Sequence, residues 1–185
     1  MTKRIQTQLL TCAATLAAIL LAGVASAQAP ASTAQPTSMQ TTLANDVGNL
    51  SDKFTGLARV MAGKYDWKPG AGVRSVGEVF NLIVNENRML NNLLTGAPNQ
   101  GRGGMGGTAI TDAAELQAAL KTTYSALRDT IAGMSDADLS AATKIFGRET
   151  TKQGATLMVL LDQHEHLGQS IAYARSNSVV PPWSK

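Results

Sequence analysis

Apolar residues spaced as on one face of a helix constrain this 185-residue chain more than any other feature. Between residues 41 and 61 they recur at alternating intervals of four and three, which is typical of a helix with one buried face. Three further stretches repeat the pattern: from Ser75 to the breaker at Gly96, from Thr111 or Asp112 to Ile131, and from Lys152 to Arg175. The residues expected in the core of the first three are Leu43, Val47, Leu50, Phe54, Leu57 and Met61; Val76, Val79, Phe80, Ile83, Asn87, Leu90 and Leu94; and Leu116, Leu120, Thr123, Leu127 and Ile131.

These four stretches predict an all-α fold, because the sequence contains no alternating run of β-branched residues that would indicate a strand. Helices of about 20 residues joined by connections of varied length favour an antiparallel four-helix bundle. We expect a short helical turn at residues 134–139, a polar connection at residues 142–151 and a loop in the glycine-rich stretch 99–107. On the last helix, the most apolar face holds Leu157, Leu160, Leu161, His164, Gly168 and Ile171.

The first 27 residues have the layout of a secretory signal peptide. Lys3 and Arg4 precede an apolar stretch at residues 9–24, and small residues ending at Ala27 form a cleavage site. The alternative is an N-terminal membrane anchor, but the apolar run is shorter than the roughly 20 residues that a span requires. We therefore expect cleavage near Ala27 and a periplasmic or secreted protein with no membrane segment after cleavage. A flexible linker at residues 28–38 and one domain at residues 39–185 complete the expected organisation.

Charge and cysteine content exclude several classes of protein. The chain carries 16 basic and 13 acidic residues, a net charge of +3, and the expected leader removes two of the basic ones. The nearly neutral remainder lacks the basic stripes of a nucleic-acid-binding protein. The single cysteine lies in the leader, which leaves no disulfide framework and no thiolate for zinc. Histidine chemistry is limited to His164 and His166.

Two segments of the sequence resemble the DinB-like family of four-helix-bundle proteins. The first comprises Tyr65-Asp66-Trp67-Lys68-Pro69 and Val73-Arg74-Ser75-Val76-Gly77-Glu78, which lead into the second helix. The second comprises His166-Leu167-Gly168-Gln169, Tyr173-Ala174-Arg175 and the C-terminal Val179-Val180-Pro181-Pro182-Trp183-Ser184. Their order and spacing are similar to the family from about Met39 onward, and its secreted members mostly lack an assigned reaction.

The resemblance implies a divalent metal site built from three histidines, one on the second helix and two at i, i+4 on the fourth. That spacing places two side chains on one helix face, near enough to share an ion. The matching positions here are Leu82, Asp162 and His166, so one histidine ligand is retained. Glu86, one turn after Leu82, is the candidate replacement, and Asn81 offers a further amide oxygen. A set of Glu86, Asp162 and His166 suits a divalent ion such as Zn, Ni, Mn or Fe.

Two interpretations of the function stay open at this point. In the first, the chain is an exported DinB-like domain whose degenerate metal site leaves it a binding or structural module. In the second, it is a metal-dependent hydrolase or transferase that uses Asp162 and His166 with a replacement third ligand. The apolar face around His164 favours a homodimer, with His164 in the core or at the interface. His166 is either a ligand or a relic that contacts Asp162.

Overall fold

The computed structural model describes residues 38–98 and 109–184. Its elements are α1 (Met39–Val60), a 3-10 turn η1 (Ala62–Lys64), α2 (Val76–Thr95), α3 (Ala113–Ala132), α4 (Asp136–Ser140), β1 (Ala142–Ile145), β2 (Arg148–Thr151) and α5 (Lys152–Ser176). The expected signal peptide, the linker up to residue 37 and the glycine-rich stretch 99–107 lie outside the described residues.

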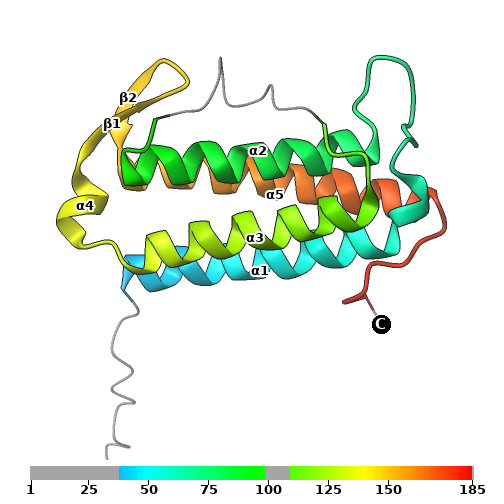
Figure 1. Cartoon of the computed structure of the whole chain (residues 1–185), viewed down its shortest axis with the longest axis horizontal. Coiled ribbons are helices and arrows are strands. Elements are labelled where there is room, and N and C mark those ends of the chain that lie inside the picture. Colours follow the sequence, from blue (N-terminus) through cyan, green and yellow to red (C-terminus); the bar gives the residue numbers. More distant parts are fainter. Residues whose placement is uncertain (1–37, 99–108, 185) are drawn as a thin grey trace, which may run out of the picture. The chain divides into compact units, whose positions relative to one another are not determined.

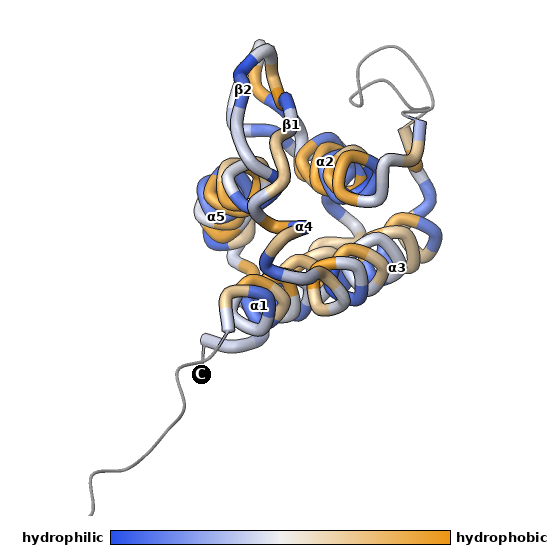
Figure 2. The backbone as a smooth tube through the Cα atoms, turned by 90° about the vertical axis from the view of Figure 1, so that its left-hand side faces the viewer, coloured by the Kyte–Doolittle hydropathy of each residue, from blue (hydrophilic) through white to orange (hydrophobic). Residues whose placement is uncertain are grey.

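Four long helices form the bundle, which confirms the all-α fold (Figure 1). In the end view, α1 and α5 lie on one side and α2 and α3 on the other, so each helix has two neighbours (Figure 2). α1 is antiparallel to α3, and α2 to α5, as expected. However, α2 and α3 run in the same direction. Two hydrogen bonds show this: Asn81 near the start of α2 bonds to Ile110 just before α3, and Asn91 near the end of α2 bonds to Thr130 near the end of α3. None of the described helices combines the length and apolar character needed to cross a bilayer.

The core consists of the faces predicted for the first three helices, all of which are buried. Its centre is aromatic: the ring of Phe54 stacks on Tyr124 at 6.2 Å between centres and meets Phe80 edge-on at 6.3 Å. α2 begins at a capping box, in which Ser75 and Glu78 exchange backbone-to-side-chain hydrogen bonds. It ends at Gly96, whose φ of +74° supplies the left-handed residue that closes many helices.

The face of α5 that points into the bundle differs from the predicted one. Leu161 is 64% exposed and Leu157 is 40% exposed, and His164 is also exposed, so the interpretation of His164 as a core residue was wrong, whereas its alternative place at a dimer interface stays a prediction. The buried face instead holds Ala155, Thr156, Val159, Leu160, Gln163, Leu167, Ser170, Tyr173 and Ala174. Hydrophobicity alone selected the wrong side, because the true core face of this helix carries several polar residues.

A buried hydrogen-bond network explains why polar residues of α5 face the core. The hydroxyl of Tyr124 donates to Oε1 of Gln163 at 3.0 Å, and Nε2 of Gln163 donates to Oδ1 of Asn87 at 2.9 Å. Nδ2 of Asn87 then donates to the hydroxyl of Thr123 at 3.3 Å. Buried amides are costly unless they are paired, and here each side chain satisfies the next. The network ties α2, α3 and α5 together in a fixed register.

Residues 142–151 form a β-hairpin, so the predictions of a polar connection there and of no strand in the chain were wrong. β1 pairs antiparallel with β2, with Ala142 opposite Thr151 and Ile145 opposite Arg148. Phe146 and Gly147 have φ values of +49° and +78°, the positive values that a two-residue type I′ turn requires at both positions. The sequence signal was weak because phenylalanine rarely occupies the first of these positions.

Candidate metal centre

Glu86, Asp162 and His166 lie together between α2 and α5. Each offers one ligand atom, and the three atoms all lie within 4.8 Å of one another. Asp162 and His166 are one turn apart on α5, with 3.6 Å between Oδ2 and Nε2. Glu86 projects from the facing helix α2. The structure thus brings together the three residues singled out as metal-ligand candidates in the sequence.

The buried network next to the site sets the position of Glu86 relative to α5. Asn87 follows Glu86 in sequence and Gln163 follows Asp162, and these two amides are joined by the 2.9 Å hydrogen bond. Both are completely buried. Because the bond fixes how far α2 and α5 are shifted along each other, it also fixes the distance between the two neighbouring carboxyl groups.

Glu86 is a buried carboxyl group without a full set of partners. The residue is 5% exposed, and its Oε2 atom has no hydrogen-bond partner among the described residues. Burial, together with the neighbouring Asp162 carboxyl, raises the pKa of Glu86 to about 8, against weaker opposing effects of Gln163 and Arg74. A buried carboxylate of this kind is costly unless a proton or a cation compensates it.

A chain of hydrogen bonds fixes the tautomer of His166. The Tyr173 hydroxyl donates to the carbonyl oxygen of Arg74 at 3.2 Å, so its own oxygen accepts from Nε2 of Gln169 at 2.7 Å. Gln169 therefore presents Oε1 to Nδ1 of His166, at 2.9 Å. An amide oxygen only accepts, so Nδ1 carries the hydrogen and Nε2 keeps a lone pair. This is how proteins orient a histidine ligand, through a hydrogen bond at the nitrogen that does not bind the metal.

The site is closed on the side of Glu86 and open on the side of Asp162. The side chain of His166 is 18% exposed and that of Asp162 is 50% exposed. A cavity of about 460 Å³ adjoins the two carboxyl groups. A ligand that enters this cavity can therefore reach the carboxyl groups of Glu86 and Asp162.

The two residues on α2 nearest the family's missing histidine contribute no ligand. Leu82 is buried at the expected position and carries no donor atom. The amide of Asn81 bonds on both sides to Ile110, with 2.8 Å from N of Ile110 to Oδ1 and 3.0 Å from Nδ2 to its carbonyl oxygen. Asn81 therefore joins α2 to the residues that lead directly into α3. Its amide oxygen is used in this contact, so the suggestion that it could offer an oxygen to a metal was wrong.

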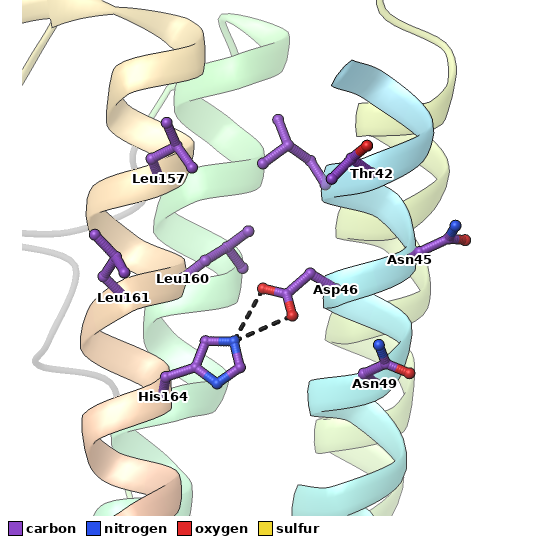
Figure 3. A pocket seen from close by; sticks show the side chains of 9 residues that line it. Thr42, Asn45, Asp46, Asn49, Leu157, Leu160, Leu161 and His164 are labelled. Atoms are coloured by element: carbon purple, nitrogen blue, oxygen red, sulfur yellow. Dashed lines mark hydrogen bonds and ion pairs between the residues drawn. The ribbon is translucent and has the colours of Figure 1, made fainter. Parts of the chain in front are cut away.

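His164 lies on the opposite side of α5 from His166 and faces α1. Its Nε2 atom contacts both oxygens of Asp46, at 3.0 and 3.1 Å (Figure 3). The pair lines an open groove of about 540 Å³ together with Leu157, Leu160 and Leu161. Within the described ranges, no third histidine, cysteine or acidic side chain joins His164 and Asp46 to form a metal-binding group. The geometry therefore gives the two histidines different places: His164 contacts Asp46 at the surface, and His166 is a candidate ligand.

The sequence motif contained the residues that orient His166, but their roles were not assigned from sequence. Gln169 and Tyr173 belong to the segment that resembles the DinB-like family. Their spacing from His166, three and seven residues, places all three on one face of a helix. That spacing is the signal from which an orienting role could have been inferred.

Comparison with known proteins places this fold among DinB-like proteins. The sequence pattern described as the DinB superfamily matches residues 52–170. A DinB-like protein from Bacillus subtilis has a similar crystal structure, with a TM-score of 0.63 and 17% identity over 78% of this chain and 97% of its own. A DinB-like protein from Bacillus cereus gives a TM-score of 0.64 and 17% identity over 76% and 93%. A search of curated proteins found no match to the sequence.

Proposed function

This chain belongs to the DinB superfamily, and we propose that it binds one divalent metal ion through Glu86, Asp162 and His166. The resemblance to that family is the reason to expect a metal site between α2 and α5. The observation that carries the proposal is the buried carboxyl group of Glu86, whose Oε2 atom has no hydrogen-bond partner among the described residues and which offers an oxygen within 4.8 Å of a donor atom of each of the other two residues. A divalent cation would compensate both carboxylates and take the lone pair of Nε2 on His166.

The donor set fits an ion that accepts oxygen ligands. Two carboxylates and one imidazole contain one more oxygen donor than the two-histidine, one-carboxylate sets of non-haem iron and of some catalytic zinc sites, and oxygen donors also suit manganese. Replacement of the family's other two histidines by oxygen donors shifts the preference toward the harder ions. We therefore expect manganese or iron to bind better, relative to zinc, than they would at a three-histidine site.

Of the two functional interpretations, the metal-dependent one is favoured by this geometry, and hydrolysis is the reaction class that we propose. A divalent ion supplies Lewis acidity and lowers the pKa of a water that it coordinates. The chain's own residues hold the donors in place: the Asn87–Gln163 bond sets the helix register, and Gln169 keeps the hydrogen on Nδ1 of His166. Asp162, half exposed, is the group that an entering ligand meets first.

Metal content tests the proposal directly. The purified protein is loaded separately with manganese, iron, nickel and zinc, dialysed, and measured by elemental analysis. We expect one ion per chain, and a loss of at least tenfold in affinity in both Glu86→Gln and His166→Ala. His164→Ala is the matched control, since His164 lies on the other side of α5, and it should retain the ion. A chain that retains no ion under any loading, or that loses it equally in His164→Ala, would leave the degenerate binding module as the better interpretation.

A further inference from the structure

The cavity beside the proposed metal site extends from the donors to the hairpin. Its lining consists of Glu86, Met89, Phe146, Arg148, Met158 and Asp162. Met89 is one turn beyond Glu86 on α2, and Met158 is one turn before Asp162 on α5. Since the two helices are antiparallel, the two methionines both lie on the hairpin side of the donors. The cavity, at about 460 Å³, falls in the range that holds small ligands.

Phe146 occupies a turn position that does not suit its side chain. It has a φ of +49° at the first position of a type I′ turn, where asparagine, aspartate or glycine is preferred. A bulky residue in this region strains the backbone. The side chain is nevertheless 62% exposed, so burial in the core does not compensate that strain. The residue also lines the cavity, where its exposed ring is accessible to a molecule that enters.

Arg148 supplies a positive charge at the same end of the cavity. Among the described residues it forms no ion pair within 4 Å, whereas the other cation of the hairpin, Lys144, pairs with Glu149 at 3.1 Å. The carboxyl groups of Glu86 and Asp162 lie at the far end of the lining, where a divalent ion would neutralise them. With that ion bound, the guanidinium of Arg148 is the remaining charge of the cavity, and it pairs well with a carboxylate or phosphate.

We propose that this cavity binds an organic anion that carries a short apolar chain, with Arg148 at its charged group and Phe146, Met89 and Met158 around its chain. The inference rests on the proposed metal site, because a bound cation would compensate the acidic side chains that share the cavity with the anion. The ligand class is set by the lining: one cation, three large apolar side chains and an open side toward solvent.

Calorimetric titration of the metal-loaded protein tests this proposal, with metal content measured on the same sample. The probes are hexanoate, hexyl phosphate, acetate and 1-hexanol. We expect at least one of the two six-carbon anions to bind at least tenfold more tightly than acetate, which lacks the chain, and than 1-hexanol, which lacks the charge. The stronger of the two identifies the anion as a carboxylate or a phosphate. Equal binding of 1-hexanol, or no binding of either anion to protein that contains its ion, would overturn the inference and leave the metal site standing.

Two variants separate a role in binding from a role in folding. Arg148→Met should weaken binding of the six-carbon anion about tenfold or more and leave metal content unchanged, whereas Lys144→Met on the same hairpin should change neither. Phe146→Asn places a preferred residue in the turn, so its melting temperature should stay equal or rise while the anion binds several-fold more weakly. Unchanged anion binding in both Arg148→Met and Phe146→Asn would contradict the proposed site. A protein without any retained ion would instead contradict the proposed metal function itself.

Discussion

Oε1 of Gln169 lies 2.9 Å from Nδ1 of His166, one helical turn along α5, and this contact leaves Nε2 of the histidine as the atom that faces Asp162. The Tyr173 hydroxyl holds Gln169 in this orientation from the next turn of the helix. The histidine's role as a candidate ligand thus depends on two residues that never approach the other donors.

This arrangement predicts that Gln169→Leu weakens metal binding about 10- to 100-fold, the range found when such orienting partners of metal ligands are removed. Tyr173→Phe should have a smaller effect in the same direction, because Gln169 then loses only one of its two partners. Competition with a chelator of known affinity measures both. Glu165→Gln, at an exposed position of α5, is the control, and affinity unchanged in Gln169→Leu would refute the orienting role.

The raised pKa of Glu86 predicts a dependence of stability on pH in the metal-free protein. Its carboxyl keeps a proton in the folded chain up to about pH 8, whereas the unfolded chain loses it near the ordinary value of 4.5. The folded state binds more protons between these values, so stability should fall as pH rises from about 4.5 to about 8, by on the order of 5 kcal/mol at most. Urea unfolding at several pH values, in the presence of a chelator, measures this. Glu86→Gln should flatten the profile over that interval, and an equally steep profile in the variant would assign it to other groups.

The buried amide network predicts a large cost for Gln163→Leu. Leucine has a similar volume but leaves the Tyr124 hydroxyl and the Asn87 carbonyl oxygen without partners in the core. Each unpaired group costs about 1–3 kcal/mol, so the free energy of unfolding should fall by roughly 2–5 kcal/mol in total. Chemical denaturation gives this value. A loss below about 1 kcal/mol would mean that the network does not fix the register of α5.

The exposed leucines of α5 are the candidate interface of the expected homodimer. Leu161 and Leu157 line the open groove between α1 and α5 together with His164 and Asp46 (Figure 3). If two chains pair through this face, Leu161→Glu should convert a dimer into a monomer in light scattering coupled to size-exclusion chromatography. Val180→Glu changes another exposed apolar residue outside the groove and should leave the mass unchanged. A monomeric wild-type protein at high concentration would rule out the dimer.

The N-terminal segment predicts export. Expression of the whole chain in a bacterium should yield a periplasmic or secreted protein whose N-terminal sequence begins at Gln28. Lys3→Glu combined with Arg4→Glu removes the positive charge before the apolar stretch and should slow this processing. Intact protein that begins at Met1 and stays with the membrane fraction would favour the membrane anchor instead.

The spacing of apolar residues was enough to predict the buried faces of α1, α2 and α3, because those faces are almost entirely aliphatic or aromatic. It failed for α5, where Gln163, Thr156 and Ser170 are buried and the leucines at 157 and 161 are not. A polar residue is acceptable in a core when its partner is present, and the partners of Gln163 come from α2 and α3. No pattern within one helix contains that information.

The candidate site also depends partly on the local sequence and partly on contacts between helices. From the sequence, the resemblance to the DinB-like family selected Asp162 and His166, and residues four apart on a helix share a face whatever surrounds them. The sequence also offered Glu86 as a candidate by its distance along α2 from Leu82. Only the tertiary structure decided that Glu86 meets that pair, since the register between α2 and α5 is set by the buried Asn87–Gln163 hydrogen bond. The strained turn that brings Phe146 and Arg148 to the adjoining cavity was likewise decided by packing between elements, which local sequence preferences do not encode.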